Sequence, residues 1–205
     1  MRESSPRADQ PCRIPIFPLR TVLFPGGVLP LRVFEARYMD MTARCMRESG
    51  VFGVCLIAEG SEVGQPAVPH AIGTSARIIT WDMVQPGLLQ LVTHGEQRFR
   101  ILSAEAGSDG LLSADVEWLP AEPAESLPEG SNPLVALLQV IIQDSGELHF
   151  PPPHRFDDAE WVGMRLSSVL PMPDEIRQQL LELEDPLTRI AVLRTFLTSQ
   201  GLTAG

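Results

Sequence analysis

The stretch from Ile14 to Tyr38, IPIFPLRTVLFPGGVLPLRVFEARY, decides the fold of this chain. Its apolar residues come in short pieces that proline or glycine interrupts every few positions. Proline lacks the N–H that a central strand needs, so such pieces form edge strands and corners. The sequence FPGG at residues 24–27 favours a turn, because glycine adopts positive φ freely. We therefore expect the chain to open on short strands that change direction at these prolines.

A helix and a series of strands are predicted next. Apolar residues fall near one face of residues 35–49, with arginines on the other, which indicates an amphipathic helix that ends at Gly50. Apolar runs of strand length predict strands at residues 51–58, 72–81, 88–93, 97–105 and 111–118. Short, closely spaced strands with little helix between them favour a barrel or a curled sheet.

The apolar period changes to that of helices after a proline- and glutamate-rich stretch at residues 120–132, which we interpret as a linker. Helices are predicted at residues 134–144, 157–170, 174–184 and 186–199. Asn132 before Pro133, and Asp185 before Pro186, have the pattern of an N-cap followed by proline. The expected fold class is α+β. A polar tail (1–12) precedes a β-barrel domain with one embedded helix (13–119), the linker and a helical bundle (133–205).

Composition excludes several enzyme classes. All 16 basic residues are arginine, so a P-loop, a Ser-Lys dyad and a Schiff-base lysine are ruled out for this sequence. Residues 1–102 carry 11 arginines and 9 acids, whereas residues 103–205 carry 5 arginines and 17 acids. With a net charge of −10 and no basic run, nucleic-acid binding is disfavoured.

Cysteine usage and the absence of an apolar leader predict a cytoplasmic protein. Cys12, Cys45 and Cys55 form no C-x-x-C pair, so free thiols are expected rather than disulfides or a zinc site. The first residues are polar, and no apolar run approaches the roughly 20 residues of a membrane helix. His149 and His154 flank a triple proline, and we interpret them as surface residues rather than metal ligands. We expect no metal and no cofactor.

The polar residues that stand out are arginines on the predicted strands. Arg77, Arg98 and Arg100 share one face of the barrel in this interpretation, and arginine suits carboxylates and phosphates. One interpretation is that they bind such a ligand in a polar cleft together with Glu62. The interpretation that we favour is that they form ion pairs with the acids of the C-terminal half. No catalytic motif accompanies them.

The first hundred residues resemble a known family. They are similar to the N-terminal domain of Lon ATP-dependent proteases in a series of ordered motifs. These motifs are PIFPLR at 15–20, LFPG at 23–26, LPL at 29–31, FEARY at 34–38, FGV at 52–54, GTSARI at 73–78 and GEQRFRI at 95–101. The C-terminal helices resemble the family's helical extension more loosely, at Trp161 and around residues 180–189.

The resemblance implies a PUA-like β-barrel followed by a helical bundle, as in a stand-alone Lon N-terminal domain without the ATPase and protease parts. It also implies a non-enzymatic module that binds unfolded or extended polypeptide, or a partner protein, with apolar contacts near the junction of barrel and bundle. Candidate peptide contacts are Phe52, Trp81, Met83 and Trp118. Two alternatives remain: a small-ligand or enzymatic role in the barrel–bundle cleft, and RNA binding through the barrel. The large phenylalanines, Phe34 among them, are expected in the core.

Overall fold

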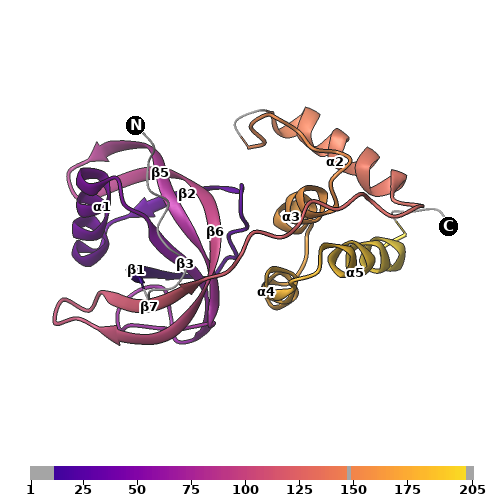
Figure 1. The fold of residues 1–205 in the computed structure, drawn as a ribbon. Coiled ribbons are helices and arrows are strands. Elements are labelled where there is room, and N and C mark those ends of the chain that lie inside the picture. The colour runs from indigo at the N-terminus through magenta and orange to yellow at the C-terminus, as the bar shows by residue number, and fades with distance from the viewer. Residues whose placement is uncertain (1–11, 147–148, 202–205) are drawn as a thin grey trace, which may run out of the picture.

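The computed structural model describes residues 12–146 and 149–201 and divides them into a strand-rich half and a helical half (Figure 1). The strands are β1 (Cys12–Leu19), β2 (Val28–Val33), β3 (Phe52–Glu59), β4 (Val68–Pro69), β5 (Ile72–Gln85), β6 (Leu88–Ala106) and β7 (Leu112–Trp118). The helices are α1 (Ala36–Glu48), α2 (Asn132–Ser145), α3 (Ala159–Val169), α4 (Asp174–Glu182) and α5 (Pro186–Ser199). The predicted α+β class is confirmed, and the polar tail lies outside the described residues except for its last position.

Five strands close a ring. The strand order is β1-β7-β6-β5-β3, and β1 pairs with β3 as well as with β7. The β1–β3 ladder is parallel, whereas the other ladders of the ring are antiparallel. Strand β2 stands off this ring and pairs only with the first part of β6, among the described residues. The barrel expected from closely spaced strands is therefore present, with β2 added beside it.

Strand β6 differs from the prediction. We expected two strands, at residues 88–93 and 97–105, but the chain forms one strand of 19 residues. Gly95 and the polar residues around it look like a break in the sequence, yet they keep the ladder with β5, which shifts register there. The first part of β6 forms a long hairpin with β5, and its second part belongs to the ring.

The helices largely follow the predicted boundaries. Asp185 caps α5 by accepting hydrogen bonds from the backbone N–H groups of Leu187 and Thr188, as predicted. The expected cap of α2 is wrong by one residue, because Ser131 occupies that position and Asn132 begins the helix. The expectation for Phe34 is also wrong: it follows β2 and is 57% exposed. No helix among the described residues is long and apolar enough to cross a membrane.

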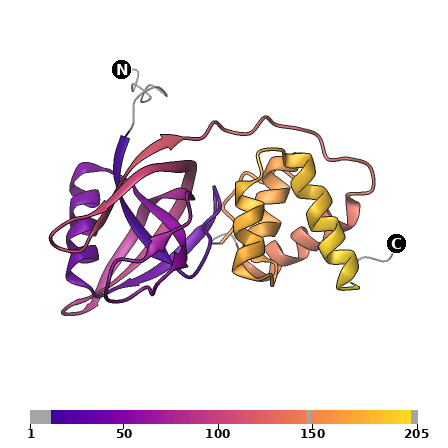
Figure 2. The same ribbon diagram turned by 90° about the horizontal axis from the view of Figure 1, so that it is seen from below.

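The two halves share one apolar core. Val22, Phe24, Leu56 and Ile72 from the strand-rich half are buried in the same cluster as the inner faces of α2 to α5. Two further clusters fill the barrel itself, one of them beneath α1. The segment interpreted as a linker arches from β7 over the helical half to the start of α2 (Figure 2). It is tied to the bundle, because Ala159 donates its backbone N–H to the carbonyl of Glu125 at 2.7 Å.

Candidate functional site

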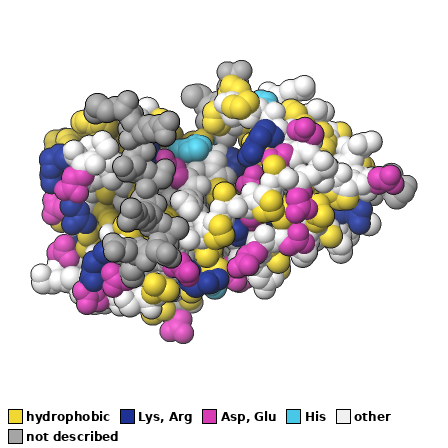
Figure 3. Space-filling view, in the orientation of Figure 1, with side chains coloured by type: hydrophobic (Ala, Val, Ile, Leu, Met, Phe, Trp, Pro, Cys, Tyr) yellow, Lys and Arg dark blue, Asp and Glu magenta, His cyan; other side chains and the backbone are white. Residues whose placement is uncertain are grey.

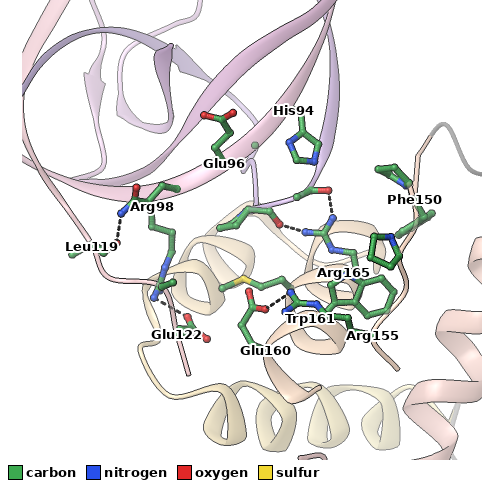
Figure 4. Close-up of a pocket in the computed structure, with 18 of the residues that line it drawn as sticks. His94, Glu96, Arg98, Leu119, Glu122, Phe150, Arg155, Glu160, Trp161 and Arg165 are labelled. Carbon is green, nitrogen blue, oxygen red and sulfur yellow. Dashed lines mark hydrogen bonds and ion pairs between the residues drawn. The ribbon is translucent and has the colours of Figure 1, made fainter. Parts of the chain in front are cut away.

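A cleft of about 680 Å³ lies where the barrel meets the bundle (Figure 4). One wall comes from the turn before β2 and the middle of β6, and the other from α3 and the segment before it. Its lining comprises residues 25–26, 94–98, 119–122, 150–153, 155, 160–161 and 164–165. Its volume is in the range of small-molecule sites, which often occur between domains. In the space-filling view, acidic and basic side chains are interspersed on both halves of the face that is shown (Figure 3).

Two glycines bring the turn against β6. The N–H of Gly26 donates to the carbonyl of Gly95 at 2.6 Å, and the N–H of Gly95 donates to Gly27 at 2.8 Å. Gly26 has a φ of 70°, in the left-handed region that favours glycine. A Cβ on Gly95 would stand 2.3 Å from the carbonyl oxygen of Phe24, so any other residue there would push the turn away. These glycines therefore set the barrel wall of the cleft.

Arg165 of α3 joins the bundle to this turn. Its guanidinium donates hydrogen bonds to the carbonyl oxygens of Pro25 and Gly26. The side chain is buried, and burial lowers its pKa to about 10, so it remains charged at neutral pH.

Burial also shifts the pKa of two neighbouring residues. It raises the pKa of Glu160, although the neighbouring Arg155 opposes this effect. Burial also lowers the pKa of His94, helped by the charge of Arg165, which favours a neutral imidazole at neutral pH.

A buried ion-pair network closes the other end of the cleft. The carboxylate of Glu122 lies 2.7 Å from Arg98 of β6 and 2.7 Å from Arg189 of α5. Arg98 also donates to the carbonyls of Leu181 and Leu183 at the end of α4, each at 2.7 Å. Burial lowers the pKa of Arg98, and Glu122 opposes that shift. Glu122, in the segment between β7 and α2, thus pairs with both the barrel and α5.

Aromatic rings and methionine form the apolar part of the cleft. Phe150, Trp161 and Met164 line it, and the Trp161 ring packs edge-on against Phe156 with centroids 5.3 Å apart. The ring of His154 lies 5.7 Å from that of Trp161. This aromatic group holds the segment after α2 against α3.

The acids and arginines of the lining are paired with one another or with Arg77 and Arg189, except Arg165, whose partners are backbone carbonyls alone. Glu96 binds Arg77, Arg155 binds Glu160 at 3.0 Å, and the other pairs are those described above. Within the described residues, no group of three or more metal-ligating side chains could hold an ion. Apart from Arg165, the described lining offers no unpaired arginine or carboxylate to a ligand, so most of the cleft suits an uncharged group such as an apolar side chain.

The structure separates the four predicted polar residues. Arg98 lines the cleft, while Arg77 pairs with Glu96 and donates to the carbonyl of Ser49 at 2.9 Å. Arg100 lies 3.6 Å from Glu117 and 3.7 Å from Glu184 on the exposed side of the junction. Glu62 lies elsewhere, in the loop before β4, where it accepts a hydrogen bond from the backbone N–H of Arg20. Arg98 and Arg100 do pair with acids of the C-terminal half; Arg77 instead pairs within the barrel.

The four predicted peptide contacts also lie apart. Phe52 is fully buried in the barrel, so it has no surface with which to contact a partner. Trp118 is half-buried against Phe99, with ring centroids 6.1 Å apart. Trp81 and Met83 are 55% and 50% exposed, but they lie near the end of the β5–β6 hairpin and line no part of the cleft.

Sequence reasoning missed Arg165 and Glu160. Arg165 interrupts the apolar run VGMRL at residues 162–166, and such a lone arginine is a usable signal of a buried, hydrogen-bonded group. Its partners are 139 and 140 positions away, at Gly26 and Pro25, so no local pattern could have named them.

Comparison with known proteins identifies the family. Residues 13–199 match the family described as "ATP-dependent protease La (LON) substrate-binding domain". The chain belongs to this LON substrate-binding domain family. A Lon protease of Anaeromyxobacter dehalogenans is 34% identical over 98 residues, which cover 47% of this chain and 12% of that protein. Protein cereblon of Gallus gallus is 30% identical over 117 residues, covering 55% of this chain and 25% of that protein. This LON-family chain therefore spans a minor part of such relatives.

Solved structures agree with the family over most of the chain. The crystal structure of a Lon N-terminal domain protein from Xanthomonas campestris superposes with a TM-score of 0.75 and is 34% identical, covering 90% of this chain and 98% of that one. The N-terminal domain of a Mycobacterium avium complex Lon protease gives a TM-score of 0.66 at 20% identity, covering 91% and 98%, and supports the fold. Both matches take in the barrel and the bundle of the LON-family chain together.

Proposed function

We propose that this chain is a non-catalytic module that binds unfolded or extended segments of other proteins. The observation that carries the proposal is a set of four exposed apolar residues within six positions of β5, which we call the hairpin strip: Ile79, Trp81, Met83 and Val84. These four side chains are between 50% and 58% exposed, although they are large and apolar. Exposed apolar residues that gather in one place mark interaction surfaces more often than scattered ones do.

Membership in a substrate-binding family supports this function. The hairpin strip would cover apolar side chains that an unfolded protein exposes, and burying one side chain the size of tryptophan or methionine contributes about 1.5–3 kcal/mol. A few such contacts give micromolar affinity after the cost of ordering the bound segment. The paired charges of the junction cleft supply no catalytic group, which fits a binding role.

The first prediction concerns Trp81→Asp. This substitution places a charge in the hairpin strip, so the affinity for an unfolded polypeptide should fall at least tenfold. Fluorescence anisotropy with labelled, reduced and carboxymethylated lactalbumin measures it, with a single-stranded RNA probe in parallel at low and moderate salt. Leu102→Asp is the matched control, because Leu102 is 55% exposed on the opposite part of β6.

The outcomes separate the candidate functions. Polypeptide binding that survives moderate salt and is lost only in the Trp81 variant supports the proposal. Equal loss in both variants, or no polypeptide binding by the wild type, contradicts it. RNA binding with a steep salt dependence would instead favour a nucleic-acid role.

The cleft of about 680 Å³ favours a second candidate function, the binding of a small uncharged ligand between barrel and bundle. Native mass spectrometry of the purified chain tests this candidate. A retained metabolite that is lost in Trp161→Ala would support it, and an unliganded mass throughout would count against it.

A further inference from the structure

A second surface lies beside β2, at the gap between β2 and the end of β1. The groove there has a volume of about 340 Å³ and is lined from β1, β2, the start of α1 and the loop before β4. Phe17 and Leu19 come from β1, and Leu29, Leu31 and Val33 come from β2. We call it the edge groove. It shares Pro30, Leu31 and Arg32 with a second hollow of about 720 Å³, which is lined by β2, β5 and β6 and includes Trp81.

Two strand edges face this groove without a strand between them. Residues Phe17 to Leu19 pair with β3 on one side, while the β1–β7 ladder stops at Ile16. Strand β2 pairs with β6 on one side, and within the described residues no strand pairs along its other edge. Unpaired edges present backbone C=O and N–H groups, although Pro18 and Pro30 contribute a C=O alone, and the ligand that matches such groups is an extended polypeptide backbone.

The walls of the groove select apolar side chains. Phe17 and Tyr38 form its floor, with their rings stacked 4.0 Å apart. Phe34 and Val63 stand at its rim and are 57% and 56% exposed. A strand projects alternate side chains to one face, so every second residue of a bound segment would reach these apolar groups.

One charged side chain of the groove, Arg32, favours an acidic residue in the bound segment, whereas the two carboxylates of the lining, Glu35 and Glu62, have hydrogen-bond or ion-pair partners of their own. Glu35 is already paired with Arg37 at 2.8 Å, and Glu62 accepts the backbone N–H of Arg20, the residue after β1. Arg32 of β2 has no hydrogen-bond or ion-pair partner among the residues that the structure describes. This free guanidinium complements a carboxylate on the incoming segment and repels a lysine or arginine. It also argues against a second copy of β2, which would bring two such arginines together.

We propose that the edge groove binds an extended segment of another protein as an additional strand beside β2, with alternating apolar residues and an acidic residue facing Arg32. The proposal rests on the proposed function and adds a site and a sequence preference to it. Strand β2 has six residues, so the bound segment would be about 20 Å long.

The test uses a labelled eight-residue peptide of alternating valine and threonine with one central glutamate. Two further versions carry N-methyl groups on alternate residues, one version for each edge of the strand, which removes backbone donors but keeps every side chain. We expect one of the two to bind at least tenfold more weakly than the parent. Amide hydrogen exchange should slow in residues 28–33 when the parent peptide binds.

Charge reversal tests the sequence preference. Arg32→Glu should weaken binding of the glutamate peptide about tenfold and strengthen that of a lysine version. Arg47→Glu is the matched control, because Arg47 is an exposed arginine of α1 that does not line the edge groove. Equal effects of both reversals would overturn the acidic preference.

Failure of this proposal differs from failure of the proposed function. If the unfolded polypeptide binds and depends on Trp81, but the peptide does not bind or is insensitive to both N-methylated versions, strand addition is overturned and the hairpin strip remains. If neither the polypeptide nor the peptide binds, both proposals fall.

Discussion

At the scale of single residues, Glu122 joins the barrel to α5. Its side chain is 3% exposed and lies between two buried arginines, one from the barrel and one from α5. The sequence offered little sign of this, because Glu122 stands in a proline- and glutamate-rich stretch that is typical of a linker. Its partners, Arg98 and Arg189, are 24 and 67 positions away, so only the folded chain brings them together.

We predict that Glu122→Gln lowers the free energy of unfolding by about 3–5 kcal/mol, because two buried guanidinium groups lose their shared counter-charge. Urea denaturation followed by tryptophan fluorescence measures this change. Glu117→Gln is the matched control: Glu117 also pairs with an arginine of β6, but its side chain is 52% exposed. Its loss should stay below about 1 kcal/mol. Similar losses in the two variants would show that the buried network does not stabilise the junction.

At the scale of elements, the sequence predicted helices better than strands. Each helix carries its own signal in apolar spacing and caps, so α1 and α5 begin and end within a residue or so of the expected positions. The apolar runs predict two strands at residues 88–93 and 97–105, whereas β6 continues through Gly95, where the missing side chain leaves room for the carbonyl of Phe24. The place of β2 off the ring could not be predicted, since pairing depends on strands far apart in the sequence.

The cap of α5 leads to a pH-dependent prediction. Hydrogen bonds from the side chain and backbone of Thr188 lower the pKa of Asp185. Because its pKa is lower in the folded than in the unfolded state, the ionised carboxyl stabilises the fold when the pH is above the unfolded-state pKa. This stabilisation is lost as the pH falls through the folded-state pKa. Asp185→Ala should therefore lower the melting temperature at pH 7 and differ less from the wild type at low pH.

Thermal melts of both proteins between pH 7 and pH 2.5 measure this difference. Asp185→Asn keeps a capping side chain and should lie between the wild type and the alanine variant at pH 7. A gap between wild type and Asp185→Ala that stays constant with pH would contradict the role of the charge.

At the scale of the whole molecule, the sequence predicted the order of the two halves but not how they are joined. The interpretation of residues 120–132 as a linker makes no statement about contacts between the halves. The structure places Phe24 and Ile72 of the barrel half in the same apolar cluster as the helices. Hydrogen bonds cross the junction too: Gln178 of α4 donates to the carbonyl of Ile72 at 3.0 Å, and Arg165 donates to the turn before β2. The junction cleft depends on these links, and no local sequence pattern identifies the two partners of any of them.

A shared core has a thermodynamic consequence. If the bundle unfolded alone, Val22, Phe24, Leu56 and Ile72 would be exposed to water, and the barrel would lose the contacts that bury them. We therefore predict a single unfolding transition, with a calorimetric enthalpy equal to the van't Hoff enthalpy. Differential scanning calorimetry measures both enthalpies.

A fragment of residues 12–119 provides the complementary test, and it should melt without a cooperative transition. Two resolved transitions, or a cooperative fragment, would show that the barrel folds without the bundle and that the cleft lies between separable domains.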